Sequence, residues 1–398
     1  MVAEPRGLHM HDSIACIREA EALLRDEHAS SDEAGRLSDK VAQVLRESGG
    51  IRLLQARDRG GYEADPRVFL EWVRTVARYN PSAGWIAGVV GVHPWELALA
   101  DERLQQEVYG ADPDTWAASP YAPQGRAIPV EGGYRFSGEW QYSTGTDHCA
   151  WVILGGIVID ETAGADAFPD IRHFVLPRGD YEIVEDSWHV MGLSGTGSKN
   201  IRITDAFVPE YRTVQHFALC DGGYADRRAG SPLYQLPFGC VFSAAIASAT
   251  LGIAQGCLDA YRGYVRTRVS ALGVVGTTDP FQQAALAEAE ADVAAAIVHI
   301  DAMLGAWLDQ VAGECAISQL QRLEFRRNQV RAVQRVLFSI DKLFSRAGSA
   351  AVWTTRSLER YWRDLRTGGS HLCDMADTAY TSWANVEFAT GGPVNTFH

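Results

Sequence analysis

Hydrophobic and polar positions change their spacing twice along this sequence, and each change indicates a different kind of structure. Up to about residue 112 the spacing is helical, because Leu37, Val41, Val44 and Leu45 recur at intervals of three and four. A second stripe of this kind runs through residues 65–79. The first part of the chain is therefore predicted to consist of helices.

Between about residues 115 and 213 the spacing of apolar residues changes to two. Tyr134, Phe136, Trp140 and Tyr142 alternate with polar residues, as a half-buried strand requires. Glycines and prolines interrupt this part of the chain and mark its turns. Further strands are predicted at 151–154, 173–176 and 201–207.

Beyond about residue 240 the pattern is helical again, and the predicted helices are long. Four long helices with short connections favour an antiparallel bundle. The preceding segment, 216–238, is rich in Gly, Asp and Pro and is predicted to be a loop that joins the strands to the bundle. The four helices are predicted at 242–270, 282–312, 318–347 and 351–366.

The order of helices, strands and helices predicts an α+β protein, with a helical domain over 1–114, a β domain over 115–215 and a helical bundle over 216–398. The regular alternation of a doubly wound nucleotide fold is missing. A glycine cluster at 192–199 precedes the predicted strand 201–207 and not a helix, which excludes a dinucleotide fingerprint. The cluster is either a turn between strands or a loop that closely approaches a flat or phosphorylated ligand.

Charge and composition narrow the class of protein. The chain has 36 Lys and Arg against 50 Asp and Glu, a net charge of −14, which disfavours nucleic acid and anionic membranes as partners. Acidic residues interrupt the most apolar stretches, and we expect no membrane span. The sequence opens without an apolar leader, and its seven cysteines are scattered. We expect a cytoplasmic protein with reduced thiols.

Metal-binding patterns are missing from the sequence. No two cysteines form a Cys-x-x-Cys pair, and the eleven histidines include no His-x-x-x-His spacing. No metal site is predicted.

Two places nevertheless combine residues that suit catalysis. Ser143 and Thr144 end the predicted strand beside aromatic residues, and they are either ordinary turn residues or hydroxyls that face a ligand. His93 precedes Pro94 in an apolar helical run, so a break or kink is predicted there. The His93 ring then either caps a broken helix in the core or projects into an interior pocket.

Four segments, taken in this order, resemble the acyl-CoA dehydrogenase fold, and most clearly the two-component flavin-dependent monooxygenases built on it. The resemblance covers about residues 30 to 390. It implies an N-terminal helical domain, a β-barrel-like middle domain and a C-terminal four-helix bundle. The segments are YNPSAGWIAGVVGVHPWE, FSGEWQYSTGTDHCAWVILGG, WHVMGLSGTGSKNIRITDAFVPE and LERYWRDLRTGGSH.

The resemblance implies an oxygenase component that hydroxylates an aromatic small molecule, with phenols as the favoured class. Such enzymes use O2 and reduced FMN or FAD, here with FMNH2 favoured, and react through a C4a-hydroperoxyflavin. A separate NAD(P)H-dependent reductase delivers the reduced flavin in a transient encounter. The resemblance also implies a homotetramer whose subunits complete one another's flavin sites.

Acyl-CoA dehydrogenation is disfavoured as the reaction, because the carboxylate base of that family is missing. The segment that follows Arg363-Asp364 leads to His371 without a glutamate, and 244–254 contains no acid. Three alternatives stay open: N-oxygenation of an amino sugar or amine on the same fold, a dehydrogenase-type oxidoreductase, and a family member that binds a ligand without turnover.

The resemblance assigns roles to single residues. Ser143 or Thr144 is expected to contact flavin N5, and His93 and His371 to share the acid–base work, with His371 as the base. A histidine with a pKa of about 6.5 is suited to take a phenolic proton near neutral pH. The substrate is expected to meet Trp85, His93, Trp95 and His371.

The remaining predicted flavin contacts fall into two groups. Those from the same chain come from the strand end and the glycine cluster, and those across a subunit interface come from the helical bundle. An arginine suits the flavin phosphate because its planar fork contacts two oxygens at once. The first group is Trp140, Tyr142, Gly195, Thr196, Gly197 and Ser198, and the second is Arg268, Arg346 and Gly348.

Overall fold

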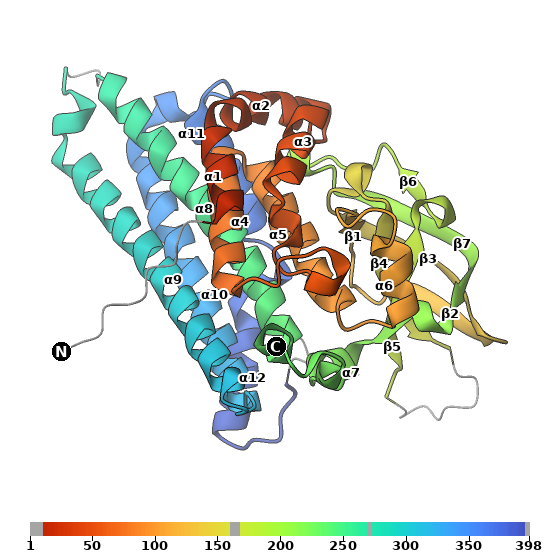
Figure 1. Cartoon of the computed structure of the whole chain (residues 1–398). Helices are drawn as coiled ribbons and strands as arrows, with labels where there is room; N and C mark the ends of the chain where they lie inside the picture. Colours follow the sequence, from red (N-terminus) through yellow and green to blue (C-terminus); the bar gives the residue numbers. More distant parts are fainter. Residues whose placement is uncertain (1–10, 160–167, 270–272, 395–398) are drawn as a thin grey trace.

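The structure is a computed structural model that describes residues 11–159, 168–269 and 273–394. Its N-terminal part is helical, and α4 and α5 lie between the long C-terminal helices and the sheet (Figure 1). The helices of this part are α1 (Asp12–Glu19), α2 (Glu21–Ala34), α3 (Asp39–Ser48), α4 (Pro66–Tyr79), α5 (Pro81–Leu97) and α6 (Glu102–Tyr109).

At the start of five of these helices, all but α2, a polar side chain accepts a hydrogen bond from a backbone N–H of the first turn. Ser38 caps α3, Asp65 caps α4 and Asn80 caps α5. Pro66 and Pro81 take the first helical position, where no N–H is needed. The two helical stripes predicted in this part are confirmed.

Of the break or kink predicted at His93, the break is wrong. Helix α5 continues through Pro94 to Leu97, and the N–H of Ala98 bonds the carbonyl of Pro94 at 3.0 Å. Every residue of α5 is buried. Packing on all sides therefore outweighs the local preference of the proline, which alone disfavours a helix interior.

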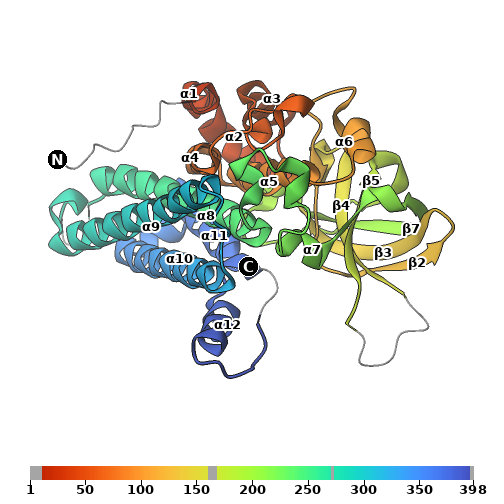
Figure 2. The same ribbon diagram turned by 60° about the horizontal axis from the view of Figure 1, so that its bottom comes forward.

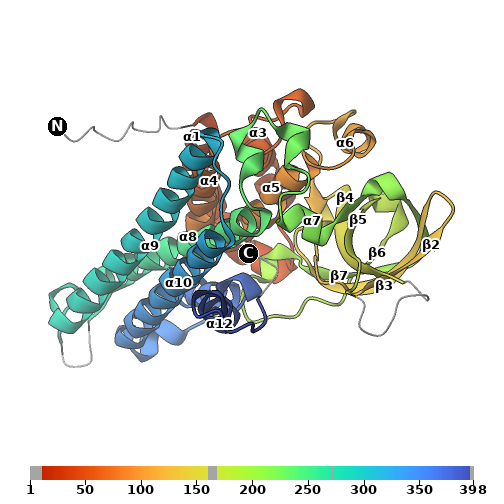
Figure 3. The ribbon, with the colours of Figure 1, turned by 90° about the horizontal axis from the view of Figure 1, so that it is seen from below.

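An eight-stranded mixed sheet forms the middle part, in the order β6-β7-β3-β2-β4-β5-β8 with β1 paired to β4. The sheet curves round its own interior like a barrel (Figure 3). The predicted strands are confirmed. The strands are β1 (Ala117–Ala118), β2 (Gly125–Val130), β3 (Gly133–Ser143), β4 (Trp151–Val158), β5 (Ile171–Pro177), β6 (Glu182–Val184), β7 (Lys199–Pro209) and β8 (Thr213–Gln215).

Aromatic rings fill the interior of the sheet. Phe136 stacks on Phe174 with ring centroids 4.1 Å apart, and its ring lies tilted against that of Trp140 at 5.2 Å. The indole N–H of Trp140 donates to the carbonyl of Gly155 at 2.8 Å. The apolar face of the alternating β3 pattern is thus the core of the β domain.

The C-terminal part is a bundle built around α8, which contacts α4 and α5 as well as α9, α10 and α11 (Figure 2). The four predicted helices are confirmed, although the last, predicted at 351–366, begins only at Ser357. The predicted loop at 216–238 is in part wrong, because it contains the short helix α7. The helices are α7 (His216–Cys220), α8 (Phe238–Thr267), α9 (Pro280–Ala312), α10 (Gln319–Ala347), α11 (Ser357–Gly368) and α12 (Ala376–Glu387).

Two helices of the described chain, α8 and α9, are long and apolar enough to cross a membrane by length and composition. The most apolar stretch of α8 is 94% buried within the protein, as expected of the central helix of a bundle. The corresponding stretch of α9 is 33% buried, which leaves an apolar face of the bundle exposed.

Candidate active site

The end of β3 carries the first part of the site. Its pairing with β7 becomes irregular between Trp140 and Ser143, and Tyr142 there has a φ of +68°. The irregularity changes which way the side chains face: Tyr142 is 63% exposed, whereas Ser143 is fully buried. Among the residues that the structure describes, the Ser143 hydroxyl has no hydrogen-bond partner.

The Thr144 hydroxyl, unlike that of Ser143, has a hydrogen-bond partner within the protein. It lies 2.9 Å from the Ser198 hydroxyl, which in turn lies 2.8 Å from the Thr196 hydroxyl. Thr196 donates to the carbonyl of Leu193 at 2.8 Å. A buried hydroxyl without a partner is costly, so Ser143 fits a polar ligand atom better than Thr144 does.

The two aromatic residues predicted to contact the flavin lie in different places. Trp140 is buried in the core of the sheet, where its ring packs against Phe136 and its N–H donates to the carbonyl of Gly155. Tyr142 lies outside, with its ring edge-on to Trp188 at 6.1 Å. The structure therefore places Tyr142, and not Trp140, on the accessible side of this turn.

The glycine cluster joins the sheet to the helices. The N–H of Gly195 donates to Asp32 at 3.2 Å, and a Cβ at Gly195 would lie 2.8 Å from the Cβ of Ser31 on α2. Gly197 has a φ of +54°, and a Cβ there would lie 2.5 Å from a carboxylate oxygen of Asp147. Both glycines thus permit close packing within the protein, and the cluster is also the predicted turn before β7.

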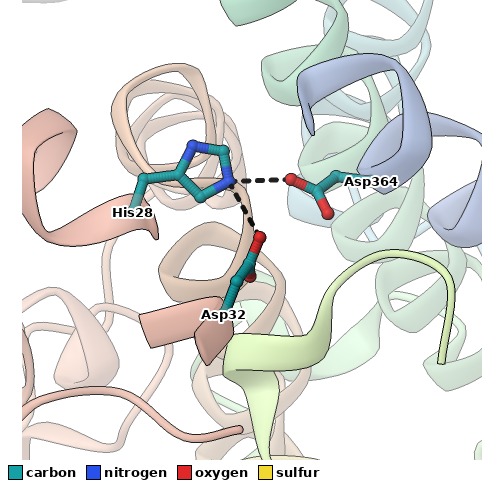
Figure 4. Close-up of side chains that lie close together, drawn as sticks. All are labelled: His28, Asp32 and Asp364. Carbon is teal, nitrogen blue, oxygen red and sulfur yellow. Dashed lines mark hydrogen bonds and ion pairs between the residues drawn. The ribbon is translucent and has the colours of Figure 1, made fainter. Parts of the chain in front are cut away.

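A buried group of three ionisable residues holds this turn in place (Figure 4). His28 Nε2 lies 2.8 Å from Asp364 and 3.8 Å from Asp32. The other oxygen of Asp364 accepts the N–H of Leu193 at 2.6 Å. Burial and the charge of Asp364 raise the pKa of the Asp32 carboxyl. Sequence reasoning missed this group, because its members come from helices more than 300 residues apart.

His93 forms the centre of the second part of the site. Its Nδ1 lies 2.6 Å from the carbonyl of Ala117 and its Nε2 2.7 Å from the hydroxyl of Ser119. Burial lowers the pKa of His93 to about 4, so the ring is neutral at neutral pH. Because a carbonyl only accepts, Nδ1 carries the proton and Nε2 accepts from Ser119. Both ring nitrogens of His93 therefore have partners within the protein, and one partner, Ser119, is a residue that no sequence pattern marks.

His371 follows α11 and begins the short turn Leu372–Asp374, where its Nδ1 accepts the N–H of Cys373 at 3.1 Å. Burial, and then the charge of Arg326, lowers the pKa of His371 to about 4. With Nδ1 used as an acceptor, the neutral ring carries its proton on Nε2. In this arrangement the Nε2 of His371 is able to donate a hydrogen bond but not to take up a proton, and the predicted role as base requires loss of the turn contact.

Aromatic rings connect the two histidines. The His371 ring is edge-on to Trp85 at 5.6 Å and lies 6.4 Å from Phe242. Phe242 is 5.4 Å from Tyr121, whose ring is 5.7 Å from His93. The predicted substrate residues Trp85, His93 and His371 are thus brought to one row of rings.

Trp95 lies behind this row. Its ring stacks on Phe238 at 5.7 Å, and its N–H donates to the carbonyl of Leu233 at 3.0 Å. Trp95 is 1% exposed and supports the aromatic wall from the side of the core.

The predicted phosphate residues lie elsewhere. Arg268 follows the C-terminal end of α8, at the end of the bundle opposite to the sheet (Figure 1). A Cβ at Gly348 would lie 2.8 Å from the guanidinium of Arg268, so Gly348 and Arg268 are neighbours at this end of the bundle. Arg346 lies over the ring of Phe281 at 5.5 Å. One chain alone therefore does not bring these residues to the turn at Ser143.

Comparison with known proteins gives the family. The family model described as acyl-CoA dehydrogenase, C-terminal domain, matches residues 244–374. A pigment production hydroxylase of Rhodococcus erythropolis is 42% identical over 89% of this chain and 90% of its own. The flavin-dependent monooxygenase, oxygenase subunit HsaA, of Mycobacterium tuberculosis is 37% identical over 92% of each chain.

The chain belongs to the oxygenase components of the flavin-dependent monooxygenases. The crystal structure of 3-HSA hydroxylase from Rhodococcus sp. RHA1 has a TM-score of 0.91 and 34% identity, and the match covers 98% of this chain and 99% of that one. The expected acyl-CoA dehydrogenase-like fold and the monooxygenase class are both confirmed. The family supports aromatic hydroxylation over the dehydrogenase and N-oxygenase alternatives.

Proposed function

We propose that this monooxygenase hydroxylates a phenolic small molecule at the row of rings between His93 and His371. One observation carries the proposal: the polar side chains of His93 and Ser119, which suit a phenolic hydroxyl, lie beside the rings of Tyr121 and Phe242, which suit a benzene ring. Related oxygenase components are named for resorcinol and p-hydroxyphenylacetate, which are both phenols. Phenols lose their proton near pH 10, so a nearby base speeds the reaction at neutral pH.

The turn at the end of β3 supplies the groups to hold a reduced flavin. Ser143 offers a buried hydroxyl, and the Thr196 and Ser198 hydroxyls fix the adjoining loop. When bound, reduced flavin supplies the electrons with which O2 is activated, and a pocket that excludes water limits loss to peroxide.

For the flavin itself, reduced FMN is the proposed form. A terminal phosphate carries up to two negative charges, more than either phosphate of a pyrophosphate linkage, and suits the guanidinium of Arg268. Anaerobic titration of flavin-free protein with FMNH2 and with FADH2 tests this choice. Tighter binding of FADH2 would overturn it.

A homotetramer is the proposed assembly. Large apolar side chains are exposed on the bundle, including Val298 at 67% and Phe338 at 68%. A neighbouring chain would also bring Arg268 and Gly348 to a flavin that one chain alone leaves without them. Light scattering should give four times the 43.5 kDa chain mass, and Val298→Lys should reduce that value. A wild-type mass of one chain would contradict the assembly.

The proposed place of action is the cytoplasm, with a separate NAD(P)H-dependent reductase as a transient partner. All seven cysteines are free thiols, in agreement with a reducing compartment. The reductase is supported by relatives that are named as oxygenase subunits, because such a name implies that a separate protein reduces the flavin.

The reaction can be tested with protein loaded with chemically reduced flavin and then mixed with O2 and candidate substrates. Hydroxylated phenols, identified by mass, are the expected products. Oxygenation of amino sugars or amines but not of phenols would favour the alternative reaction, in which a nitrogen atom receives the oxygen. Peroxide alone with every substrate would contradict an oxygenase function.

A further inference from the structure

Helix α11 binds the loop that leads into the glycine cluster at two backbone atoms. The Arg363 guanidinium donates to the carbonyl of Met191 at 2.5 Å, and the Asp364 carboxylate accepts the N–H of Leu193 at 2.6 Å. A Cβ at Gly192, between them, would lie 2.4 Å from the carbonyl oxygen of Arg363. The Arg363-Asp364 pair thus holds three consecutive residues of this loop against α11.

Leu193 has a backbone conformation that leucine rarely adopts. Its φ is +58°, in the left-handed region, where a Cβ lies too close to the neighbouring backbone. Such a conformation persists only where the surrounding structure holds it, and conformations of this kind gather at binding sites. The hydrogen bond from the Leu193 N–H to the fully buried Asp364 is the polar contact that holds it here.

The conformation of Leu193 also decides where the following turn lies. Its carbonyl accepts the N–H of Thr196 at 3.1 Å and the hydroxyl of Thr196 at 2.8 Å. The Thr196 hydroxyl lies 2.8 Å from that of Ser198, which lies 2.9 Å from that of Thr144. Rotation about φ of Leu193 changes the direction in which the chain leaves α11, so this row of hydroxyls moves with it.

His28 holds the Asp364 carboxylate from the other side. Its Nε2 lies 2.8 Å from the oxygen of Asp364 that does not bond Leu193 (Figure 4). Its ring packs edge-on against Tyr361 of α11 at 5.0 Å. Since a buried polar atom without a partner is costly, His28 stabilises the orientation in which Asp364 faces Leu193. Helices α2 and α11 therefore act on the turn through one carboxylate.

The same helix leads to the substrate side of the site. α11 ends at Gly368, whose carbonyl accepts the N–H of His371 at 3.0 Å. A Cβ at Gly368 would lie 3.0 Å from the ring of Trp85. One helix of 12 residues thus bears both the contact with the turn and the start of the segment that carries His371.

On the basis of the flavin site proposed above, we propose that Asp364, supported by His28, is a positioning residue for the flavin. It acts by holding Leu193 in the left-handed conformation. A turn that already has its bound shape needs no ordering when the flavin binds, so the flavin binds more tightly. Without Asp364, Leu193 returns to a negative φ, and each flavin that binds must re-form the turn.

A substitution at Leu193 tests this without changing Asp364. Leu193→Ile keeps the apolar volume, but its β-branched side chain makes the left-handed region still less favourable. Anaerobic titrations of wild type with FMNH2 and with FADH2 show which binds more tightly, and Leu193→Ile should raise that Kd about tenfold. Leu176→Ile is the matched control, because Leu176 is equally buried but lies in strand β5, which suits a β-branched residue. It should leave the Kd unchanged.

A double-mutant cycle then tests whether Asp364 acts through Leu193. Asp364→Ala alone should raise the Kd about tenfold. In the Leu193→Gly background it should raise the Kd at most about threefold, because glycine adopts the left-handed region without steric cost. Asp364→Asn offers an acceptor to Leu193 and a donor to His28, and should stay within about threefold of wild type.

Equal effects of Asp364→Ala in the two backgrounds would overturn the inference. An unchanged Kd in Leu193→Ile would also overturn it, and this variant decides the matter if Asp364→Ala fails to fold. Failure of wild type to bind either reduced flavin would overturn it as well. These measurements need no turnover, so a lack of phenol hydroxylation would contradict the proposed function alone.

Discussion

Ser143 and Thr144 are neighbours in the sequence, but their hydroxyls have different surroundings. Ser143 is buried without a hydrogen-bond partner among the described residues, whereas Thr144 bonds Ser198. We expect Ser143→Ala to leave thermal stability unchanged and to lower product formed per reduced flavin at least tenfold, with a matching rise in peroxide. A hydroxyl that holds a reactive group in place accounts for this loss.

Thr144→Val is the matched control for that substitution. It removes one hydrogen bond within the protein and should cost about 1 kcal/mol of stability, while most of the product yield is kept. Product loss in Thr144→Val but not in Ser143→Ala would reverse the assignment of the two hydroxyls.

His371 combines a structural contact with a position beside Trp85, and the two can be separated. We expect His371→Asn to keep the turn, because an asparagine side chain also accepts the N–H of Cys373. His371→Ala should lose that contact and about 1 kcal/mol of stability. Both variants should bind flavin and lose hydroxylation, as measured by product yield. Full hydroxylation by either variant would remove His371 from the reaction.

Residue type and the family resemblance singled out Ser143, His93 and His371 from the sequence, and their roles stay predictions. Their partners were not predictable. Ser119 contacts His93 from a loop whose meeting with α5 depends on the complete fold. No spacing in the sequence marks such a contact, and the same holds for His28 with Asp364.

At the scale of elements, helix and strand periodicity predicted most of the structure because it reports which face is buried. The break or kink expected in α5 came from local proline chemistry and not from periodicity, and burial on all sides keeps that helix unbroken. Periodicity gave no helix for α12, which is only partly buried beside α10 and so has a weaker apolar stripe.

Close packing of the glycine cluster against the bundle gives a prediction at this scale. A Cβ at Gly192 would lie 2.4 Å from the carbonyl oxygen of Arg363 on α11, so Gly192→Ala must move the turn or the helix. We expect a loss of about 1–3 kcal/mol in unfolding free energy and weaker flavin binding. Gly179→Ala is the control, since nothing lies within 4 Å of its Cβ position. Equal effects of the two substitutions would show that this packing does not position the turn.

At the scale of the whole molecule, buried neutral histidines couple stability to pH. The pKa of His371 is about 4 in the folded protein and near 6.5 when the chain is unfolded. The unfolded state therefore takes up the proton first, and stability falls as pH drops from about 6.5 toward 4. Denaturant titrations should show this slope reduced in His371→Asn by about 1.4 kcal/mol per pH unit.

Asp374 acts in the opposite direction over the same range. Burial raises the pKa of its carboxyl to about 7, so the folded state holds that proton and loses stability as pH rises toward 7. The contribution of His371 is therefore obtained from the difference in unfolding free energy between wild type and His371→Asn at each pH. Parallel stability curves for the two proteins would contradict a His371 that stays neutral in the folded protein.

The distance between Arg268 and the turn at Ser143 within one chain gives a prediction about assembly. If a neighbouring chain supplies Arg268, then Arg268→Ala should raise the Kd for reduced flavin about tenfold without changing the fold. Anaerobic titration measures this change. An unchanged Kd would place the flavin phosphate elsewhere.

Overall architecture was predictable because the order of helical and alternating segments is a local property of the sequence. A meeting of Arg268 and Gly348 with Ser143 in the proposed assembly could not be derived in this way, because a pattern within one chain carries no information about contacts between chains.

Oxygen-isotope transfer tests the central claim most directly. Protein loaded with reduced flavin is mixed with 18O2 and a phenol for one turnover, and the product is analysed by mass. The account predicts one 18O atom in the added hydroxyl and product from most of the reduced flavin. Peroxide equal to the flavin oxidised, with no 18O in the phenol, would contradict it.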